Sequence, residues 1–427
     1  MRAIRPAPRG AAFAARPIAD TPASAATRRR SPFRMPIAAS PAAAQRRVIV
    51  LTGILFVSYL TVAMALPTVP IEVHDRLGLD NALGGLAVGL PFLTTLLTRA
   101  QAGRLADERG GRRCMLRGLG VYTVASAICM AAAVPAAPHL RFAVLLAGRA
   151  LLGVGESQVA VGMIGWGIGL MGHARSGKVI ALVGAGMYGA LAVGGPLGLA
   201  LFRALGFAGL MATCTLLSVL GAAIAFRFPD APPTPGQRQP LWRVVRRIAL
   251  PGAAVGLQGI GFAALGAFMS LDFLSKGWPG AGLGLTCFGI GFVLMRLAFG
   301  DLPDRVGGTA VAAGSLLVEA TGQYLIWLAP EAWVALLGAL MTGLGCSMVF
   351  PSMGKEAIRR VEPHLRGTAI GGFAAFQDLA YGATGPVVGL LADRTGYASV
   401  FLIGGIAATL GFGAALLAHR GARGAAG

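Results

Sequence analysis

Apolar runs long enough to cross a membrane follow one another along most of the 427-residue chain. A membrane-spanning helix needs about 20 mostly apolar residues, because unpaired backbone polar groups are costly in the hydrocarbon core. Charged residues make up only 13% of the chain, whereas a soluble protein would carry roughly 25%. A transmembrane barrel would alternate apolar and polar residues over segments of about ten, and this sequence lacks that alternation. The sequence therefore predicts an all-α integral membrane protein.

From position 48 onward, we count twelve candidate transmembrane helices. They cover residues 48–71, 83–102, 114–134, 142–171, 179–205, 208–228, 248–271, 283–299, 309–329, 333–350, 369–391 and 400–417. The sixth and seventh are separated by a proline-rich linker at 229–247, which ends in a predicted short helix on the membrane surface at 241–247. The pattern predicts six-helix bundles at 48–228 and 248–419, and a C-terminal tail at 420–427.

The first 47 residues form a basic tail that is rich in alanine, proline and arginine. It contains no apolar segment before position 48, which excludes a secretory signal peptide. Its arginine-rich, acid-poor composition resembles an organellar transit peptide. We interpret it instead as a disordered cytoplasmic arm. A true start at Met35 is the other alternative.

A polar, glycine-rich turn between the second and third spans returns in the second half of the chain. Residues 103–113 read Gly-Arg-Leu-Ala-Asp-Glu-Arg-Gly-Gly-Arg-Arg, and residues 300–308 read Gly-Asp-Leu-Pro-Asp-Arg-Val-Gly-Gly. The fourth and fifth spans are related to the tenth and eleventh by a similar offset. The matched residues of the first half are Gly148, Gly153, Gly155, Ser157 and Gly195-Pro196. Their counterparts in the second half, in the same order, are Gly338, Gly343, Gly345, Ser347 and Gly385-Pro386. Corresponding spans run in the same direction, so the sequence predicts a 6+6 parallel repeat.

Lysine and arginine are concentrated in alternate connections, on the side that also holds the N-terminus. The positive-inside rule therefore predicts that both termini are cytoplasmic. This bias also explains the net charge of +20, and no soluble basic domain is present to bind nucleic acid. The five cysteines lie in or beside apolar runs, where they are interpreted as packing residues. No metal site and no cofactor are expected.

Twelve spans, a parallel repeat and the turn at 103–113 together resemble the Major Facilitator Superfamily. The superfamily's signature between the second and third helices reads Gly-x-Leu-Ala-Asp-Arg-x-Gly-Arg-Arg. The residues that fit it are Gly103, Leu105, Ala106, Asp107, Gly110, Arg112 and Arg113. Glu108 replaces the usual arginine, and Gly111 is an extra residue. The resemblance covers about 48–417, and the order of elements is similar to bacterial permeases labelled sugar-efflux or arabinose-efflux type.

Two further motifs support this resemblance. Residues 149–155 look like the superfamily's fourth-helix Arg-x-x-x-Gly-x-Gly motif, slightly shifted, and Gly195-Pro196 partly matches its antiporter motif. The turn itself is interpreted as a gating and structural element, because its aspartate can accept hydrogen bonds from helix amides or from neighbouring arginines. An ordinary positive-inside loop is the alternative. The gating set is Gly103, Leu105, Asp107, Gly110, Arg112 and Arg113, with Gly300, Asp304 and Arg305 of the repeat.

Charged side chains deep in the membrane cost roughly 3 kcal/mol or more each unless they are paired, so each one is a functional candidate. Arg149 and Glu156 lie seven residues apart on the fourth span, near one face of a helix. A carboxyl group in a low-dielectric site can exchange a proton as a cavity opens to either side. Glu156, Asp378 and the less favoured Glu319 are therefore the proton-coupling candidates. A static Arg149–Glu156 ion pair is the alternative.

The resemblance implies a central cavity lined by the first, fourth, seventh and tenth helices. It places Arg149 within reach of this cavity, paired with Glu156 or with an anionic group of the substrate. Arg99 and Arg296 are interpreted as structural arginines that reach toward the inner membrane edge. The remaining polar candidates for the substrate cavity are Tyr59, Gln158, Tyr188, Gln258 and Gln377.

The leading interpretation is a secondary active transporter of the bacterial inner membrane, which exports a sugar-like, drug-like or metabolite substrate in exchange for protons. An uptake symporter or facilitator is the alternative within transport, and a membrane receptor or scaffold is the alternative outside it. Residues 172–178 look like the start of a P-loop, but Val179 replaces the required serine or threonine. Neither ATP-driven transport nor enzyme activity is therefore expected. The expected partners are the substrate, protons and the lipid bilayer, and a monomer is expected.

Overall fold

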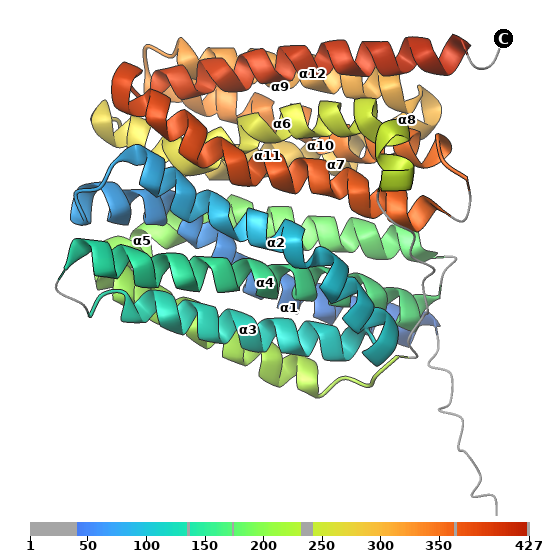
Figure 1. Cartoon of the computed structure of the whole chain (residues 1–427), viewed down its shortest axis with the longest axis horizontal. Helices are drawn as coiled ribbons and strands as arrows, with labels where there is room; N and C mark the ends of the chain where they lie inside the picture. Colours follow the sequence, from blue (N-terminus) through green and yellow to red (C-terminus); the bar gives the residue numbers. More distant parts are fainter. Residues whose placement is uncertain (1–40, 135–136, 173–174, 232–241, 363–364, 425–427) are drawn as a thin grey trace, which may run out of the picture. The chain divides into compact units, whose positions relative to one another are not determined.

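The computed structural model describes residues 41–134, 137–172, 175–231, 242–362 and 365–424 of the chain. Within these ranges every regular element is helical, and most helices run side by side along one direction (Figure 1). The elements are, in chain order, α1 Pro41–Ile71, the π-helical turn η1 Glu72–Arg76, α2 Asn81–Arg109, α3 Gly111–Ala131, α4 Pro138–Met171, α5 Ser176–Phe226, α6 Trp242–Ser275, α7 Leu283–Phe299, α8 Leu302–Arg305, α9 Gly308–Trp327, α10 Ala332–Arg359, α11 Arg366–Thr395 and α12 Ala398–Gly424.

The long helix α5 is two membrane crossings joined at Gly206. The backbone there has φ 69° and ψ −178°, a conformation that glycine adopts far more readily than other residues. When α5 is divided at this kink and the four-residue α8 is set aside, the described residues form twelve crossings. The eighth predicted span coincides with α7 at both ends. The predicted all-helical fold with twelve transmembrane helices is confirmed.

The helices extend beyond several of the predicted boundaries, and α2 continues to Arg109, into the predicted turn. α1 begins at Pro41, so residues 41–47 are helix rather than tail, because proline suits the first helical position and alanine and arginine favour helix. α12 continues to Gly424, into the predicted C-terminal tail. The predicted surface helix is, from Trp242, the first part of α6. Residues 1–40, 232–241 and 425–427 lie outside the described part of the chain.

Both halves turn at the same glycine of the repeated motif. Gly110 and Gly307 have φ of 88° and 105°, and they immediately precede α3 and α9. Residues with a side chain are strained in this region of backbone space, so glycine is needed at both positions. The halves differ just before the turn, where α2 is continuous but α7 ends and α8 follows. Pro303 lacks the amide hydrogen that would continue α7.

The repeated glycines make equivalent contacts in the two halves. A side-chain carbon on Gly153 would collide with the backbone of α2, and one on Gly343 would collide with the backbone of α7. Gly155 lies in the same way against α3, and Gly345 lies against α9. Small residues let helices approach closely in lipid, where no hydrophobic force drives them together. α4 and α10 therefore hold equivalent places in a 6+6 parallel repeat.

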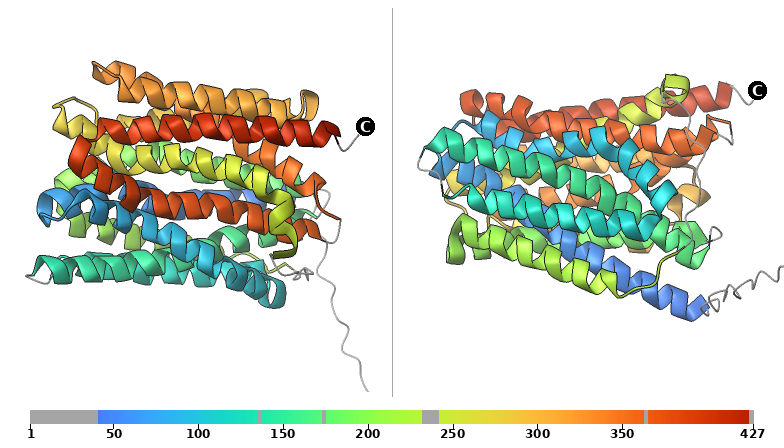
Figure 2. Two further views of the ribbon diagram at one scale, coloured as in Figure 1. Left: turned by 45° about the horizontal axis from the view of Figure 1, so that its top comes forward. Right: turned by 60° about the horizontal axis from the view of Figure 1, so that its bottom comes forward.

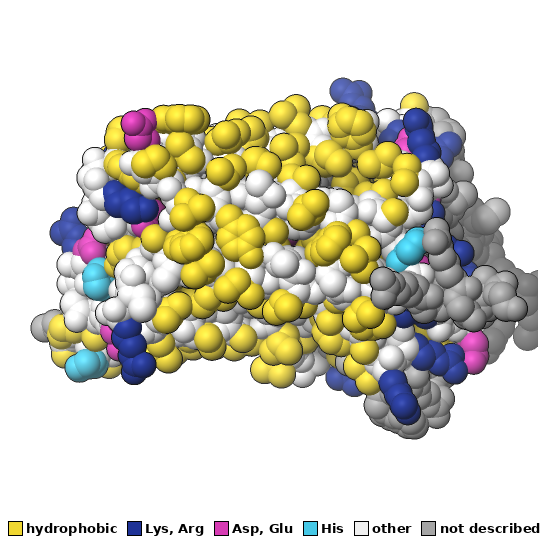
Figure 3. Space-filling view, turned by 90° about the horizontal axis from the view of Figure 1, so that it is seen from above, with side chains coloured by type: hydrophobic (Ala, Val, Ile, Leu, Met, Phe, Trp, Pro, Cys, Tyr) yellow, Lys and Arg dark blue, Asp and Glu magenta, His cyan; other side chains and the backbone are white. Residues whose placement is uncertain are grey.

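The outer surface is apolar midway along the helices and charged at their two ends (Figure 3). Leu317 of α9, Leu390 of α11 and Leu410 of α12 are each more than half exposed. By length and hydropathy alone, eight of the described helices can cross a membrane, and α7 is a shorter apolar helix. An apolar surface between two charged ends is what a bilayer requires of a protein that spans it.

Candidate functional site

The two repeated turns, with Gly110 and Gly307, lie at one end of the helices, here called the turn end. The opposite end holds the connections that follow α1, α3, α6, α9 and α11. Two helix pairs make most of the contact between the halves, namely α2 with α11 and α5 with α7. The first pair is seen as the blue and orange-red helices that run side by side in Figure 2. Any motion of one half against the other must therefore change these two contacts.

Along α5 and α7, close contact ends about halfway between the two ends. Near the opposite end, Pro196 of α5 lies against Gly282. Further along, the ring of Tyr188 stacks on that of Phe292, with 3.4 Å between the ring centroids and 15° between the ring planes. Beyond these rings, toward the turn end, a cavity of about 500 Å³ separates the two helices. We call this cavity the crevice.

The helices α2 and α11 also meet toward the opposite end. Gly85 and Gly385 are so close that neither position has room for a side-chain carbon. Asn81 donates from Nδ2 and from its backbone nitrogen to Asp393 Oδ1, at 2.7 and 3.2 Å. The Tyr397 hydroxyl donates to Asn81 Oδ1 at 3.1 Å, and burial raises the pKa of this hydroxyl. The opposite end is thus closed by both helix pairs, while the turn end is open at the crevice.

An ion pair joins the two halves near the middle of α2 and α11. Arg99 donates from Nε and Nη2 to Asp378 Oδ2, at 2.9 and 2.5 Å. The Asp378 side chain is 10% exposed and that of Arg99 is 30% exposed. Sequence reasoning selected Asp378, but it missed the functional interest of Arg99. The sequence does contain a sign of this ion pair, because Arg99 is a charged residue within an apolar span. The prediction placed its side chain at the membrane edge instead.

Glu156 of α4 lies within electrostatic reach of this ion pair. Its Oε1 accepts a hydrogen bond from the Tyr59 hydroxyl of α1 at 3.3 Å. Its Oε2 is buried and has no hydrogen-bond partner among the described residues. The charges of Asp378 and Arg99 both act on Glu156. Tyr59, Arg99, Glu156 and Asp378 therefore form one group, buried except for the partly exposed Arg99. We call this group the central cluster and take it as the candidate site.

The position that the repeat aligns with Glu156 holds an uncharged residue in the second half. Cys346 of α10, which the repeat aligns with Glu156, accepts a hydrogen bond from Gln258 Nε2 of α6 at 3.0 Å. Gln377 Nε2 of α11 donates to Gln258 Oε1 at 3.2 Å. Two predicted cavity residues thus lie together, and Gln377 directly precedes Asp378 of the central cluster.

Two other predicted residues of α4 contact neighbouring helices instead. Arg149 donates from Nε to the Ala87 carbonyl of α2 at 2.8 Å, and its Nη2 has no partner in the described part of the chain. Within that part, no salt bridge joins Arg149 to Glu156. Gln158 lies against Gly118 of α3. Substrate contacts by Arg149 and Gln158, and the Arg149–Glu156 pair, stay predictions.

Glu319 lies inside the second half of the protein. Its side chain is fully buried beside Gly261 of α6 and Gly345 of α10. Neither carboxylate oxygen has a hydrogen-bond partner in the described ranges, although the thiol of Cys346 is a close neighbour. None of these contacts is with the central cluster, so a role of Glu319 in proton coupling stays a prediction.

Each repeated turn is held by its own half. Arg112 donates from Nη2 to the Phe226 carbonyl at 2.7 Å, and its guanidinium lies over the Phe226 ring. In the second half, Asp304 forms an ion pair with Lys355 of α10. These contacts anchor the turns but do not link the halves, as is expected while the turn end is open. The gating role of the two turns stays a prediction.

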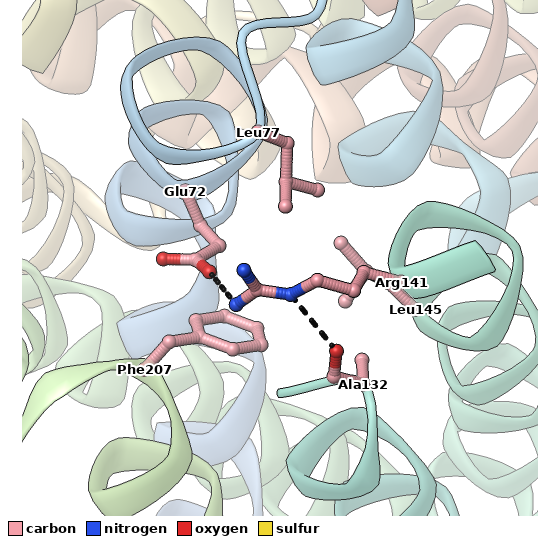
Figure 4. Close-up of a pocket in the computed structure, with 6 residues that line it drawn as sticks. All are labelled: Glu72, Leu77, Ala132, Arg141, Leu145 and Phe207. Atoms are coloured by element: carbon pink, nitrogen blue, oxygen red, sulfur yellow. Dashed lines mark hydrogen bonds and ion pairs between the residues drawn. The ribbon is translucent and has the colours of Figure 1, made fainter. Parts of the chain in front are cut away.

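A smaller pocket at the opposite end is occupied by a structural ion pair and is not a ligand site (Figure 4). Arg141 of α4 donates from Nη2 to Glu72 Oε1 of η1 and from Nε to the Ala132 carbonyl, each at 3.2 Å. The remaining cavity measures about 10 Å³, which leaves room for no more than a single water. Arg141 thus ties together the ends of α1, α3 and α4.

The fold and the site together define a class of protein. Two parallel six-helix repeats, closed against each other at one end and sharing a buried charged cluster, form the architecture of an alternating-access membrane transporter. The family model of the Major Facilitator Superfamily matches residues 51–274 and 252–425, about one half of the chain each time. The chain belongs to this superfamily.

Relatives and solved structures agree with this assignment. The chain is 45% identical over 363 residues to an uncharacterised MFS-type transporter of Salmonella typhimurium. The alignment covers 84% of this chain and 93% of that protein. The fold of this chain is similar to that of the nucleoside transporter NupG, with a TM-score of 0.70 at 16% identity. It is also similar to that of the human organic anion transporter MFSD10, with a TM-score of 0.65 at 18% identity. Each match covers 87% of this chain and 99% of the solved one. At these identities the solved structures show the fold alone.

Proposed function

We propose that the chain is a proton-coupled secondary transporter that exports a small molecule across the bacterial inner membrane. The observation that carries this proposal is the central cluster, which lies buried where the two halves meet. An unpaired carboxyl group is costly deep in a membrane, so its presence there favours a functional role. Glu156, whose Oε2 is unpartnered in the described structure, is the group best placed to take up a proton.

Arg99 can couple proton uptake to motion. While Asp378 is ionised, Arg99 holds α2 to α11 and favours the conformation that is closed at the opposite end. A proton on Asp378 removes this attraction, and Arg99 can then interact with Glu156 instead. Each conformation is thus favoured by a different protonation state, which is what coupling requires.

In this proposal the turn end faces the cytoplasm. The lysine and arginine bias of the connections supports that orientation, with both termini inside. The described conformation is then inward-facing, and the two six-helix bundles rock about the central cluster as a monomer. Closure of the turn end would be the task of the gating residues at 103–113 and 300–305.

Reconstitution into proteoliposomes tests the proposal. A melting-temperature screen first identifies a solute that binds, because a substrate stabilises the state to which it binds. Uptake driven by a pH gradient is then compared with solute exchange in the absence of a gradient. Glu156→Gln and Asp378→Asn are expected to lose gradient-driven flux and to keep exchange, while the exposed Glu331→Gln serves as the control. Unimpaired gradient-driven flux in both variants would refute proton coupling, and a failure of every solute to move would refute transport.

A further inference from the structure

We propose that the crevice between α5 and α7 admits organic anions, so that the transported molecule carries a carboxylate, phosphate or sulfonate group. This inference rests on the proposed transport function and specifies the class of its substrate. The cavity of about 500 Å³ is within the range of roughly 300–1,000 Å³ that small-molecule sites occupy. It lies at the open turn end, between one helix of each half.

Most residues that line the crevice are apolar, and among its charged residues the cations outnumber the acids. Lys178 of α5, Arg296 of α7 and Arg305 of α8 line it, against the single acidic residue Asp301. Asp301 lies 3.9 Å from Arg305, and both side chains are largely exposed. No carboxylate pairs with Lys178 or Arg296 among the described residues. The crevice therefore has an excess of positive charge, which raises the local concentration of anions.

The positive-inside rule explains only part of this charge. Lys178 and Arg305 lie next to the connections at the turn end, where such residues are expected. Arg296 lies in the last turn of α7, four residues before Gly300, where it is half-buried and has no acidic partner among the described residues, which is costly. A function at this position gives a reason for that cost, and recognition of an anion is the function that a guanidinium serves best.

Arg296 is also held in a fixed position at the inner end of the crevice. Its Nη2 donates to the Ser347 carbonyl of α10 at 2.7 Å, and its Cζ lies 5.3 Å from the centroid of the Phe292 ring. The remaining guanidinium donors have no protein acceptor in the described ranges, so they are available to a ligand. An anion bound there would lie beside the stacked rings of Tyr188 and Phe292, because Phe292 is the ring that the Arg296 guanidinium covers.

Thiol chemistry measures the potential of the crevice directly. Ala185→Cys places a reporter on the crevice wall, in a Cys287→Ser background because Cys287 is the one described cysteine that is not buried. The cysteine reacts in lipid-free detergent with two methanethiosulfonates, the anionic sulfonatoethyl reagent and the cationic trimethylammonioethyl reagent. The ratio of the anionic to the cationic reaction rate is divided by the same ratio for a free thiol in solution. We expect the anionic reagent to be favoured about 5-fold or more. Excess benzoate should slow the reaction, and benzamide should not.

Charge-removing variants and added lipid distinguish an organic-anion site in the crevice from a lipid-headgroup site. Lys178→Gln and Arg296→Gln should move the ratio toward one, whereas Arg246→Gln, an exposed turn-end residue outside the crevice, should leave it unchanged. A ratio that favours the cationic reagent, or equal protection by benzoate and benzamide, would overturn the proposal. Protection by phosphatidylglycerol but not by benzoate would assign the site to a lipid headgroup, and would also overturn it. Because no step requires flux, these results are independent of the proton-coupling test.

Discussion

The contact between Gly85 and Gly385 predicts that a larger residue at position 385 will open the opposite end. In Gly385→Val the added carbons would overlap the carbonyl group of Gly85 on α2. Because the obstacle is backbone, no side-chain rotation can relieve the overlap. The two helices must therefore separate where they now close the protein.

The expected magnitude follows from the cost of overpacking, which is about 1–3 kcal/mol for extra carbons in a well-packed site. That free energy corresponds to a shift of roughly 5–150-fold in the equilibrium between two conformations. The Asn81–Asp393 hydrogen bonds oppose the separation, so we expect the lower part of this range. Gly371→Val on the same helix is the matched control, since a side-chain carbon at Gly371 meets no other atom within 4 Å.

Two cysteine reporters, one toward each end of the contact between α5 and α7, read out the result. Leu285→Cys is buried against Gly195 near the opposite end, and Ala185→Cys lines the crevice. In Gly385→Val, maleimide labelling should accelerate at position 285 and slow at position 185. If the variant is monodisperse and labelling at position 285 stays as slow as in Gly371→Val, the glycine contact is not what closes this end.

Four further predictions concern the polar groups. Asn81→Ala should accelerate labelling of the same opposite-end reporter several-fold. Because burial raises the pKa of Tyr397, the stabilisation that depends on its protonated hydroxyl is complete below about pH 10 and is lost as the pH rises through the folded-state pKa. The melting temperature should therefore fall less steeply above pH 10 in Tyr397→Phe than in the wild type. In a double-mutant cycle on denaturant unfolding, Arg99→Gln and Asp378→Asn should show a coupling of about 1–2 kcal/mol, between the values for exposed and buried pairs, and additive effects would argue against the pair. Glu319→Gln should unfold within about 1 kcal/mol of the wild type, whereas Glu319→Ala should cost about 2 kcal/mol through the cavity it leaves; equal losses would point to an ion partner for the carboxylate.

Much of the fold could be predicted because a bilayer imposes strict rules on length and composition. The twelve spans follow from hydropathy. The repeat follows from glycines that allow close contact between helices at equivalent positions of both halves. The repeated Gly-Pro pairs illustrate this. Pro196 lies against Gly282, and Gly385 lies against Gly85, so both pairs lie where the halves meet. Each copy of the motif therefore marks a position at which the two halves meet.

The partners across the halves could not be predicted, because hydropathy gives the depth of a residue but not the direction in which its helix faces. Arg99 and Asp378 are 279 residues apart, and their pairing depends on the register of α2 against α11. Rotation matters as much as depth. Glu156 and Gln158 are two residues apart, or about 200° around a helix, so one joins the central cluster and the other contacts α3.

Alternating access requires the crevice to close when the opposite end opens, and its charges make that closure depend on what it contains. Closing brings Lys178 of α5 toward Arg296 and Arg305, with Asp301 as the only acidic group among the crevice-lining residues. Like charges repel more strongly as they approach, so an empty crevice would resist closure. A bound anion would offset this repulsion in the closed form more than in the open form. A ligand shifts a conformational equilibrium only through such a difference in affinity, so the charges that attract an anion would also make its binding drive the transition.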